Sequence, residues 1–360
     1  MRLVLIIMTI IISLSCSSDD SNTGNPSVNE ELYFPPTDSE EWETLTVESL
    51  DWNISEEQAL YNFLEASDTN AFLILKDGKI VIEWYMNNFS QNDIWYWASA
   101  GKTLTALTLG IAQEEGYLDL EDSSLNYLGS GWSSLTTEQE INIKVIHHLT
   151  MTTGLDFTDF FNQFCTDPDC LFYLNEPGEF WYYHNAPYTL LDNVITGAVA
   201  MDFEDYFAEK IRDKIGMRGF WLQNGYNNIY RSDARSMARF GLLCLNNGTW
   251  NNEVILNDTN YFQAMVNTSQ NLNKAYGYLW WLNGKESYRL PGSTENFTGK
   301  LIPNAPNDLI AGLGANDQKL YVVPSRNLVI IRLGDNGGEG QLGPSGYDNL
   351  LWEKLSAFID

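Results

Sequence analysis

Hydrophobic and polar positions follow a strand-like pattern near both ends of the chain. Two β-rich runs, residues 72–76 and 79–84, flank the dipeptide Asp77-Gly78. Asp-Gly supplies the left-handed conformations that a tight hairpin turn needs, so this segment predicts a β-hairpin. Residues 322–332 form a second apolar segment, interrupted by Pro324 to Asn327, and predict another hairpin with its turn there.

Helical spacing fills much of the remaining sequence. Residues 103–112 predict a mostly buried helix that begins near Ser99, and residues 350–359 predict a helix that closes the fold on a sheet. The middle of the chain, roughly 115–265, alternates short helical patterns with loops. Strands at both ends and helices between them predict an α+β fold, with one antiparallel sheet built from both termini and a helical insert beside it.

Composition supports a globular and strongly acidic domain. The chain has 360 residues, of which 44% are hydrophobic, and this apolar content excludes wholesale disorder. Lys and Arg total 20 and Asp and Glu total 48, so the formal net charge is −28. Such a surface repels phosphate backbones, and nucleic acid is therefore not expected as a partner.

The first 16 residues have the features of a secretory signal. Arg2 precedes the apolar run 3–12, small residues follow, and the run is too short to span a bilayer. Cys16 then resembles the acylated cysteine of a bacterial lipoprotein, although Ser13 stands where the usual Leu would be. Residues 17–20 resemble the acidic export tag of Bacteroidetes surface lipoproteins. We expect a lipid-anchored protein of the periplasm or cell surface; the alternative is a cleaved signal with an incidental cysteine.

Three segments are therefore predicted along the chain. Residues 1–16 form the signal ending at the lipidated Cys16, residues 17–38 form a flexible tether rich in Ser, Asn, Asp and Pro, and residues 39–360 form the folded domain. The membrane is expected as a partner only through the N-terminal lipid.

Cysteine and histidine positions argue for a disulfide and against a metal site. Cys165 and Cys170 bracket a turn-forming sequence in a chain expected to reach an oxidising compartment, so a small-loop disulfide is possible. Cys244 lies in an apolar helical run and is expected to be a buried thiol. The histidines at positions 147, 148 and 184 do not pair with a cysteine at ligand spacing, so neither a metal nor a cofactor is expected.

The sequence Ser99-Ala-Gly-Lys102 is the first candidate for chemistry. Positions three apart share a helix face, and a Ser in the first turn lies near free amides and the positive helix end. A desolvated Lys can take the proton of the hydroxyl or favour the alkoxide. The spacing alone is common, and the alternative is a Ser N-cap beside a solvated Lys. Trp95, Tyr96 and Trp97 and the apolar helix favour a buried Lys102.

Two further segments add candidate groups. In the aromatic-rich sequence 177–185, Tyr183 is a candidate proton shuttle if a nearby Lys lowers its pKa, and Asn185 could hold a substrate carbonyl or the Lys. Packing is the alternative for these aromatics, and we expect it of Trp181 and Tyr182. In Ala311-Gly-Leu-Gly-Ala315, glycines would let the backbone approach a ligand, and a main-chain amide could complete an oxyanion hole with that of Ser99; the alternative is a tight strand-edge turn.

These motifs resemble, in type and order, the serine β-lactamase-related superfamily, which includes class C β-lactamases, D-alanyl-D-alanine carboxypeptidases, SxxK esterases and nylon-oligomer hydrolases. The resemblance runs from the Asp77-Gly78 hairpin to Arg332. It is carried by the segments Ser99-x-x-Lys102, His147 to Leu155, Pro177-Gly-Glu179, Tyr183-x-Asn185, Ser232 to Gly241 and Tyr276 to Trp281. It implies an antiparallel sheet flanked by helices, a mostly helical subdomain, and a site between them.

The resemblance also implies roles. Ser99 would attack a carbonyl and form an acyl-enzyme, while Lys102 and Tyr183 together accept and return its proton. Asn185 would position the substrate, and the amides of Ser99 and Ala315 would form the oxyanion hole.

One departure from the family pattern bears on the substrate. The third family motif begins with Lys or His, whereas this chain has Gly312-Leu313-Gly314 at that position. The missing cation usually recognises a substrate carboxylate, so an exported esterase or amidase acting on a small ester, amide or peptide-like molecule fits better than a β-lactamase. The alternatives are a D,D-carboxypeptidase or β-lactamase acting on peptidoglycan or penicillins, and a non-catalytic surface binding protein on the same fold.

Overall fold

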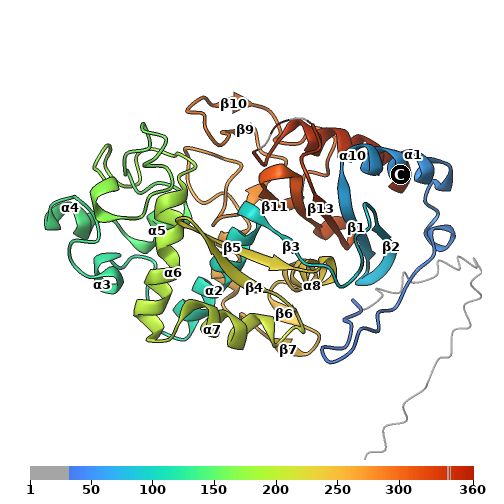
Figure 1. The fold of residues 1–360 in the computed structure, drawn as a ribbon, viewed down its shortest axis with the longest axis horizontal. Coiled ribbons are helices and arrows are strands. Elements are labelled where there is room, and N and C mark those ends of the chain that lie inside the picture. The colour runs from blue at the N-terminus through green and yellow to red at the C-terminus, as the bar shows by residue number, and fades with distance from the viewer. Residues whose placement is uncertain (1–31, 339, 341) are drawn as a thin grey trace, which may run out of the picture. The chain divides into compact units, whose positions relative to one another are not determined.

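The computed structural model describes residues 32–338, 340 and 342–360 (Figure 1). The predicted signal segment, Cys16 and most of the predicted tether lie outside these residues. The described chain contains one six-stranded sheet, with helices on it and a largely helical region beside it.

The central sheet joins the two ends of the described chain. Its strand order is β2-β1-β13-β12-β11-β8, and every neighbouring pair is antiparallel. Its strands are β1 (Thr69–Lys76), β2 (Lys79–Tyr85), β8 (Trp281–Leu282), β11 (Ile310–Gly314), β12 (Gln318–Val323) and β13 (Leu328–Gly334). Because β1 pairs with β13, the sheet is built from strands near both ends of the chain, as the sequence predicts. The α+β prediction is confirmed.

Both predicted hairpins are present. Asp77 and Gly78 connect β1 to β2 with φ angles of 51° and 81°, which is the left-handed pair of a type I′ turn. The turn between β12 and β13 is a short 3-10 helix, η7 (Pro324–Arg326), and it ends at Asn327 in the left-handed region.

Most α-helices of the described chain lie between β2 and β11. The helices are α1 (Glu57–Ala66), α2 (Lys102–Glu114), α3 (Leu125–Leu128), α4 (Thr137–Asn142), α5 (Val145–Leu149), α6 (Asn185–Val199), α7 (Phe203–Phe207), α8 (Ala234–Leu245), α9 (Thr259–Met265) and α10 (Gly346–Ile359). None of the helices in the described ranges combines the length and the apolar character needed to cross a bilayer.

Smaller sheets lie within and beside the helical region. Strands β3 (Trp95–Tyr96), β4 (Phe220–Asn224) and β5 (Asn227–Ser232) form a three-stranded sheet in the order β3-β5-β4. Two further strand pairs are present: β6 (Thr249–Trp250) with β7 (Glu253–Val254), and β9 (Ser287–Tyr288) with β10 (Phe297–Thr298).

Strand β12 shows how the two faces of the central sheet are covered. Leu320 faces α8, because a Cβ placed on Gly241 of α8 would lie 2.8 Å from its Cδ1 atom. Its chain neighbour Tyr321 faces the other way, with its ring 5.6 Å from that of Trp352 on α10. Alternate residues of a strand point to opposite faces, so α8 and α10 cover opposite sides of the sheet. With both faces covered, every residue of β12 is buried.

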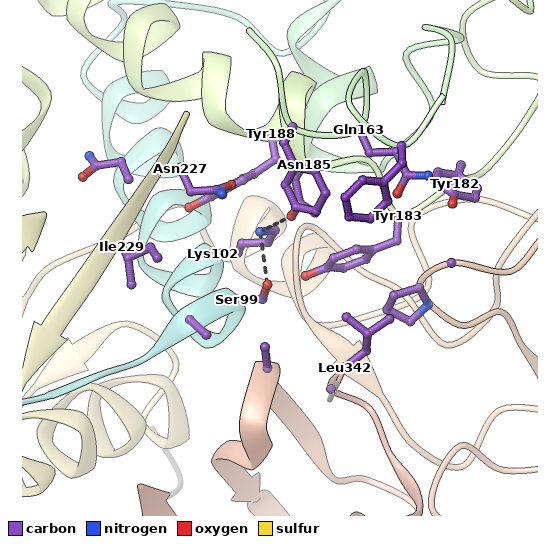
Figure 2. Close-up of a pocket in the computed structure, with 18 residues that line it drawn as sticks. Ser99, Lys102, Gln163, Tyr182, Tyr183, Asn185, Tyr188, Asn227, Ile229 and Leu342 are labelled. Carbon is purple, nitrogen blue, oxygen red and sulfur yellow. Dashed lines mark hydrogen bonds between the residues drawn. The ribbon is translucent and has the colours of Figure 1, made fainter. Parts of the chain in front are cut away.

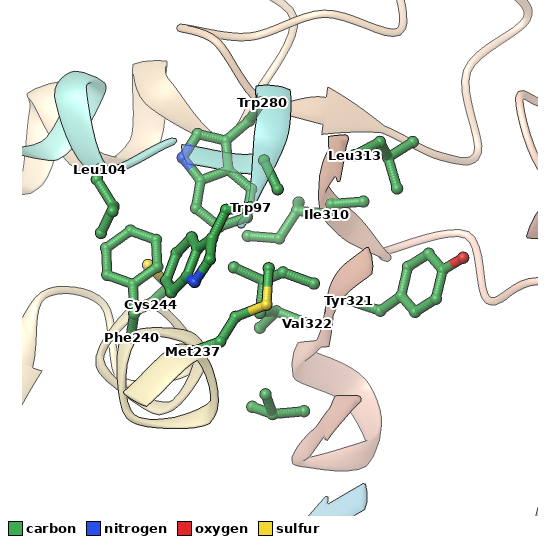
Figure 3. Close-up of a cluster of buried hydrophobic side chains, with 14 of the residues drawn as sticks. Trp97, Leu104, Met237, Phe240, Cys244, Trp280, Ile310, Leu313, Tyr321 and Val322 are labelled. Atoms are coloured by element: carbon green, nitrogen blue, oxygen red, sulfur yellow. The ribbon is translucent and has the colours of Figure 1, made fainter. Parts of the chain in front are cut away.

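The core on the α8 side extends to the segment that begins α2. Trp97 is fully buried there, together with Phe240 of α8 and Trp280 (Figure 3). The Trp97 indole donates a hydrogen bond of 2.8 Å to the Ser232 hydroxyl, and its main-chain amide bonds to the Tyr230 carbonyl. This packing fixes the backbone two residues before Ser99.

On the α10 side a buried ionic cluster ties the sheet to the end of β11. The Lys319 ammonium lies 3.1 Å from the Asp317 carboxylate and 2.8 Å from that of Asp348, and all three side chains are at most 1% exposed. Asp348 also accepts from Tyr321, and Asp317 accepts from Ser345. The cluster joins β12, α10 and the short helix η6 (Ala315–Asp317).

Lys319→Met is expected to destabilise the fold by about 3–5 kcal/mol, because two buried carboxylates would lose their shared cation. The midpoint of urea unfolding measures the effect. Lys354→Met, at a half-exposed lysine on α10, is the matched control and is expected to change stability by less than about 0.5 kcal/mol. A midpoint for Lys319→Met equal to that of the control would show that the cluster does not stabilise the fold.

The last residues of the predicted tether pack on the domain. The Tyr33 amide bonds to the Asp77 carbonyl, and the Arg239 guanidinium donates to the carbonyls of Pro35 and Pro36. Residues 32–38 therefore belong to the compact unit that extends to Asp360, and the predicted domain start at residue 39 is too late. Their composition resembles a linker, but their carbonyl groups satisfy a buried arginine.

Candidate active site

Ser99 lies in a 3-10 turn, η3 (Ala98–Gly101), which leads directly into α2. The preceding residue, Ala98, has a φ angle of 46°. A residue with a Cβ pays about 1–2 kcal/mol for this conformation, and such residues concentrate at functional sites where the surroundings enforce them. Here Trp97, anchored in the core, holds the turn from one side, and the expectation that a helical segment begins near Ser99 is confirmed.

Lys102 reaches back from the first residue of α2. Its ammonium donates to the Asn185 side-chain oxygen at 2.9 Å and lies 3.4 Å from the Ser99 hydroxyl (Figure 2). The side chain is buried, as expected, and the residue is 4% exposed. Desolvation lowers the pKa of Lys102 to about 7, and the charge of Asp192 partly opposes that shift. Near neutral pH, Lys102 can therefore accept a proton.

Tyr183 brings a second proton-carrying group to Ser99. Its hydroxyl points toward the Ser99 side chain in Figure 2, and its ring stacks on Trp281. Burial raises the pKa of Tyr183 well above its ordinary value, and the interaction with Ser99 opposes the shift only in part. The condition that a nearby Lys lowers this pKa is not met, because burial dominates and the opposing interaction is with Ser99. At neutral pH Tyr183 is a phenol that can donate a proton.

Asn185 and Tyr188 complete the surroundings of the Lys102 ammonium. Both project from the first turns of α6. Of the two partners that the sequence allows for Asn185, a substrate carbonyl or the Lys, the structure shows the Lys102 ammonium in contact at 2.9 Å. The Lys102 nitrogen lies 3.8 Å from the centre of the Tyr188 ring, within the range of a cation–π interaction. Tyr188 is a contact that the sequence analysis did not assign, although its i+3 spacing from Asn185 places both on one helix face.

Of the motif Gly312-Leu313-Gly314-Ala315, Ala315 lines the cavity, whereas Gly312 and Gly314 do not. Ala315 follows β11 and lines the cavity that contains Ser99. Gly312 and Gly314 instead allow β11 to pass against η3: a Cβ on Gly314 would lie 3.2 Å from the Ala100 nitrogen, and one on Gly312 would lie 3.3 Å from the Ala100 oxygen. In the structure these glycines permit a close approach to η3, and neither of them lines the cavity.

Hydrogen bonds from three elements hold the turn after β11. The Gln318 side chain donates to the carbonyls of Ala315 and Asn316, and the Arg332 guanidinium donates to those of Asn316 and Asp317. The side-chain amide of Asn316 in turn donates to the Tyr96 hydroxyl. The position of the Ala315 backbone relative to Ser99 is thus set by side chains that are themselves fixed.

The cavity above Ser99 has a volume of about 420 Å³, and half of the residues that line it are aromatic or carry a side-chain amide (Figure 2). Among the described residues that line it, Lys102 is the basic side chain and none is acidic. The lining residues beyond the predicted site are Ala98, Phe160, Gln163, Phe164, Tyr182, Tyr188, Asn227, Asn228, Ile229, Pro291, Gly292, Leu342 and Gly343. Tyr182 was expected to be a packing residue only; it is largely buried but also lines the cavity, whereas Trp181 is wholly buried.

The aromatic wall of the cavity is tied to the start of α6. The Gln163 carbonyl accepts from the Ala186 amide, and the His184 ring bonds to the Asn162 carbonyl at 2.9 Å. The predicted disulfide between Cys165 and Cys170 is present, and it closes the short loop that follows Phe164. Phe160 and Phe164 are therefore held beside the residues that carry Tyr183 and Asn185.

The histidines and cysteines of the described chain lie in hydrogen bonds, in a disulfide or in the core. His148 bonds to the Pro187 carbonyl at 2.7 Å, and burial lowers its pKa to about 4, so its ring is neutral at pH 7. Cys165, Asp167 and Cys170 lie close together, but the two sulfur atoms are joined in the disulfide and are not thiolate ligands. Cys244 is a buried free thiol, as expected.

Comparisons with known proteins agree with this fold. The family model "Beta-lactamase" matches residues 65–334. A putative 6-aminohexanoate-dimer hydrolase from Bacillus anthracis is 18% identical, with a TM-score of 0.68 over 90% of this chain and 88% of its own. A putative beta-lactamase from Bacteroides dorei is 15% identical, with a TM-score of 0.67 over 86% and 99%. The D-alanine carboxypeptidase AmpC from Burkholderia cenocepacia is 16% identical, with a TM-score of 0.61 over 84% and 98%. No curated protein matches the sequence.

Proposed function

Because the chain belongs to the beta-lactamase family, whose members are generally hydrolases with a catalytic serine, we propose that it is an exported serine hydrolase that cleaves an ester or amide bond through a Ser99 acyl-enzyme. The observation that carries the proposal is the convergence of Ser99, Lys102 and Tyr183 at the floor of one cavity. These groups come from two separate segments of the chain, and together they supply a nucleophile, a base and a proton donor.

The proton path follows from the pKa values of the two partners. Neutral Lys102 takes the proton of Ser99 as the Oγ atom attacks the carbonyl carbon, and it becomes an ammonium. Tyr183, a phenol at neutral pH, donates its proton to the leaving oxygen or nitrogen and is reprotonated from Lys102. Water then attacks the acyl-enzyme by the reverse path and releases the acid. Lys102 is accordingly the general base, and Tyr183 carries the proton to the leaving group.

The negative charge of the tetrahedral intermediate would be stabilised by the main-chain amides of Ser99 and Ala315. This assignment is supported by the position of Ala315 at the cavity and by the hydrogen bonds that fix its turn. Amides that are held in place before the reaction stabilise developing charge without reorganisation, and one such donor typically contributes about 10²–10³-fold to kcat.

The walls of the cavity favour an uncharged acyl substrate. Among the described residues that line the cavity, Lys102 is the basic side chain that could pair with an anionic substrate. Because Lys102 is needed as the general base, it is not free for that pairing. Phe160 and Phe164 instead offer apolar surface, and Gln163, Asn227 and Asn228 offer neutral hydrogen-bonding groups. The net charge of −28 further disfavours anions.

A panel of substrates tests this proposal. The protein without its signal segment is expected to hydrolyse neutral p-nitrophenyl esters or anilides at least tenfold faster, in kcat/KM, than matched substrates that carry a carboxylate near the scissile bond. Ser99→Ala, run in parallel, identifies the hydrolysis that depends on the site. Faster turnover of the carboxylate-bearing series would contradict the substrate class while leaving the serine mechanism in place.

Peptidoglycan or penicillin chemistry is the second candidate, favoured by the similarity to a D-alanine carboxypeptidase. Stable labelling of Ser99 by a fluorescent penicillin would support it over the esterase or amidase. A non-catalytic binding protein is the third candidate, and failure of a fluorophosphonate probe to label the folded protein would favour it.

Export and lipid anchoring are part of the proposal and rest on residues 1–20, which lie outside the described residues. The disulfide between Cys165 and Cys170 supports an oxidising compartment. The proposed anchor holds the protein at the periplasmic or outer face of the outer membrane. Lipidation is checked by the incorporation of a labelled fatty acid in cells, which is expected to be lost in Cys16→Ala. Incorporation retained in Cys16→Ala would contradict the anchor.

A further inference from the structure

A buried carboxyl group lies behind the candidate active site. Asp192 is on α6, four residues after Tyr188 and seven after Asn185. Positions separated by three, four and seven residues share one helix face, and on this face Asn185 and Tyr188 both contact the Lys102 ammonium. Asp192 extends the same row by one turn, along the helix that packs on α2.

The two oxygens of Asp192 have different surroundings. Oδ2 accepts a hydrogen bond of 3.0 Å from the side-chain amide of Asn228 on β5. Oδ1 is buried and has no hydrogen-bond partner among the described residues. A buried carboxylate with one unpartnered oxygen is costly unless a nearby positive charge compensates it. Lys102 supplies such a charge, since each of the two groups acts electrostatically on the other.

We propose that Asp192 is a positioning residue whose carboxylate is the counterion of the Lys102 ammonium at the moment when Lys102 holds the proton of Ser99. This inference rests on the proposed serine hydrolase function. In the step concerned, the Ser99 O–H bond breaks, the Oγ–substrate bond forms and the Lys102 nitrogen gains the proton. Above about pH 7, where Asp192 is ionised, the carboxylate keeps its charge through this step and exchanges no proton.

The other groups around the pair do not replace this charge. Tyr183 and Tyr188 are neutral at physiological pH because burial raises the pKa of each. Thr105 of α2 faces the Tyr188 hydroxyl at 3.4 Å, and Asn228 of β5 contributes a neutral amide. Burial raises the pKa of Asp192 to about 7, and the like charge of Asp202, the N-cap residue of α7, adds to this shift. The Asn228 hydrogen bond and the charge of Lys102 oppose the shift.

The consequence for the base is an increase in its proton affinity. The carboxylate raises the pKa of Lys102 and so opposes the desolvation that lowers it to about 7. Without the carboxylate, Lys102 would lose its proton at lower pH and would also be a weaker base, because proton transfer from Ser99 depends on the stability of the ammonium formed.

The experiment measures how fast a fluorophosphonate probe labels Ser99 between pH 5.5 and 9, and so needs no knowledge of the substrate. For the wild type, the second-order rate constant is expected to rise with pH to a plateau above about pH 7. For Asp192→Asn, the rising limb is expected about one pH unit lower, and the plateau about tenfold lower. The two rate constants would then be similar near pH 5.5 and about tenfold apart at pH 8, by the same two effects.

Asp205→Asn is the matched control, because it removes the same charge from the exposed side of α7. It is expected to leave both the limb and the plateau unchanged. If the labelling rate constant of Asp192→Asn falls by the same factor at every pH, Asp192 has a merely structural role. If the pH profile is unchanged, Asp192 has no role in the reaction. Either result overturns the proposal.

A second measurement separates this proposal from the proposed function. If the wild type does not label at all, the serine mechanism fails, but the Lys102 pKa can still be read from the ¹³C resonances of lysine-labelled protein, with Lys102→Met providing the assignment. A Lys102 pKa at least half a unit lower in Asp192→Asn than in the wild type supports the counterion, whereas equal values overturn it.

Discussion

Ser99→Ala is expected to reduce kcat on the best substrate of the ester and amide panel by about 10⁴-fold or more, down to the rate that binding and the oxyanion donors alone support. The reason is the absence of a substitute nucleophile, since the groups next to Ser99 are Lys102 and a protonated Tyr183. Removal of the hydroxyl leaves the turn intact, because Trp97 and the close packing of β11 hold it. Initial rates and the urea midpoint, measured on the same preparation, are the readouts.

Ser49→Ala provides the control for this variant, because Ser49 is exposed and lies in the short 3-10 helix 47–50 near the start of the domain. It is expected to keep full activity. A fluorophosphonate adduct should be found on the peptide that contains Ser99 in the wild type and in Ser49→Ala, but not in Ser99→Ala. Activity retained in Ser99→Ala would remove this serine from the mechanism.

Local signals in the sequence predicted the α+β fold and the proximity of Ser99 to Lys102. The turn at Asp77-Gly78 specifies a hairpin by its backbone conformation alone. Ser99 and Lys102 need only the geometry of one helical turn to come together. Tyr183 and Asn185 were found through the order of motifs along the chain, since no local rule places α6 beside α2.

The walls of the cavity could not be predicted in the same way. Phe160 and Leu342 are far apart in the sequence, and no periodic pattern connects them. Their place at the cavity follows from tertiary packing: the aromatic segment is fixed to α6 by main-chain bonds at Gln163. The same holds for Gly312 and Gly314, whose small size permits contact with η3, a function that the sequence does not distinguish from ligand binding.

Electrostatic properties were the least predictable part of the site. Desolvation decides the pKa values of both Lys102 and Tyr183, and burial depth is a property of the whole fold. Asp192 is an acidic residue in a helix, and in the sequence it cannot be told from an exposed one. Its partner Asn228 is 36 residues away along the chain.

Lys102→Met is expected to lower kcat/KM by about 10³-fold at pH 8, since the general base is lost. In the wild type, kcat/KM should rise as the pH increases through about 7, because desolvation lowers the pKa of Lys102 to about 7 and the neutral amine is the active form. The variant should lack this limb. Lys144→Met, at a half-exposed lysine paired with Glu121, is the control and should keep the profile of the wild type. A wild-type limb that persists in Lys102→Met would assign the base to another group.

The same variant is expected to be more stable than the wild type, by about 2–4 kcal/mol at pH 6. Lys102 has a pKa of about 7 in the folded protein and 10.5 as its ordinary value, so below pH 7 the fold carries a buried ammonium at a cost. As the pH rises from 7 toward 10.5, the unfolded chain binds more protons than the folded one, and the wild type gains stability. The difference in stability between Lys102→Met and the wild type should therefore be smaller at pH 9 than at pH 6. A second effect acts in the same direction, because Asp192 has a pKa of about 7 and at pH 9 would be ionised in the variant without its counterion. Urea midpoints at pH 6 and pH 9 measure both effects. A loss of stability at both values would mean that Lys102 is a paired structural cation, whereas a gain that is largest at pH 6 is what a base kept neutral by burial requires.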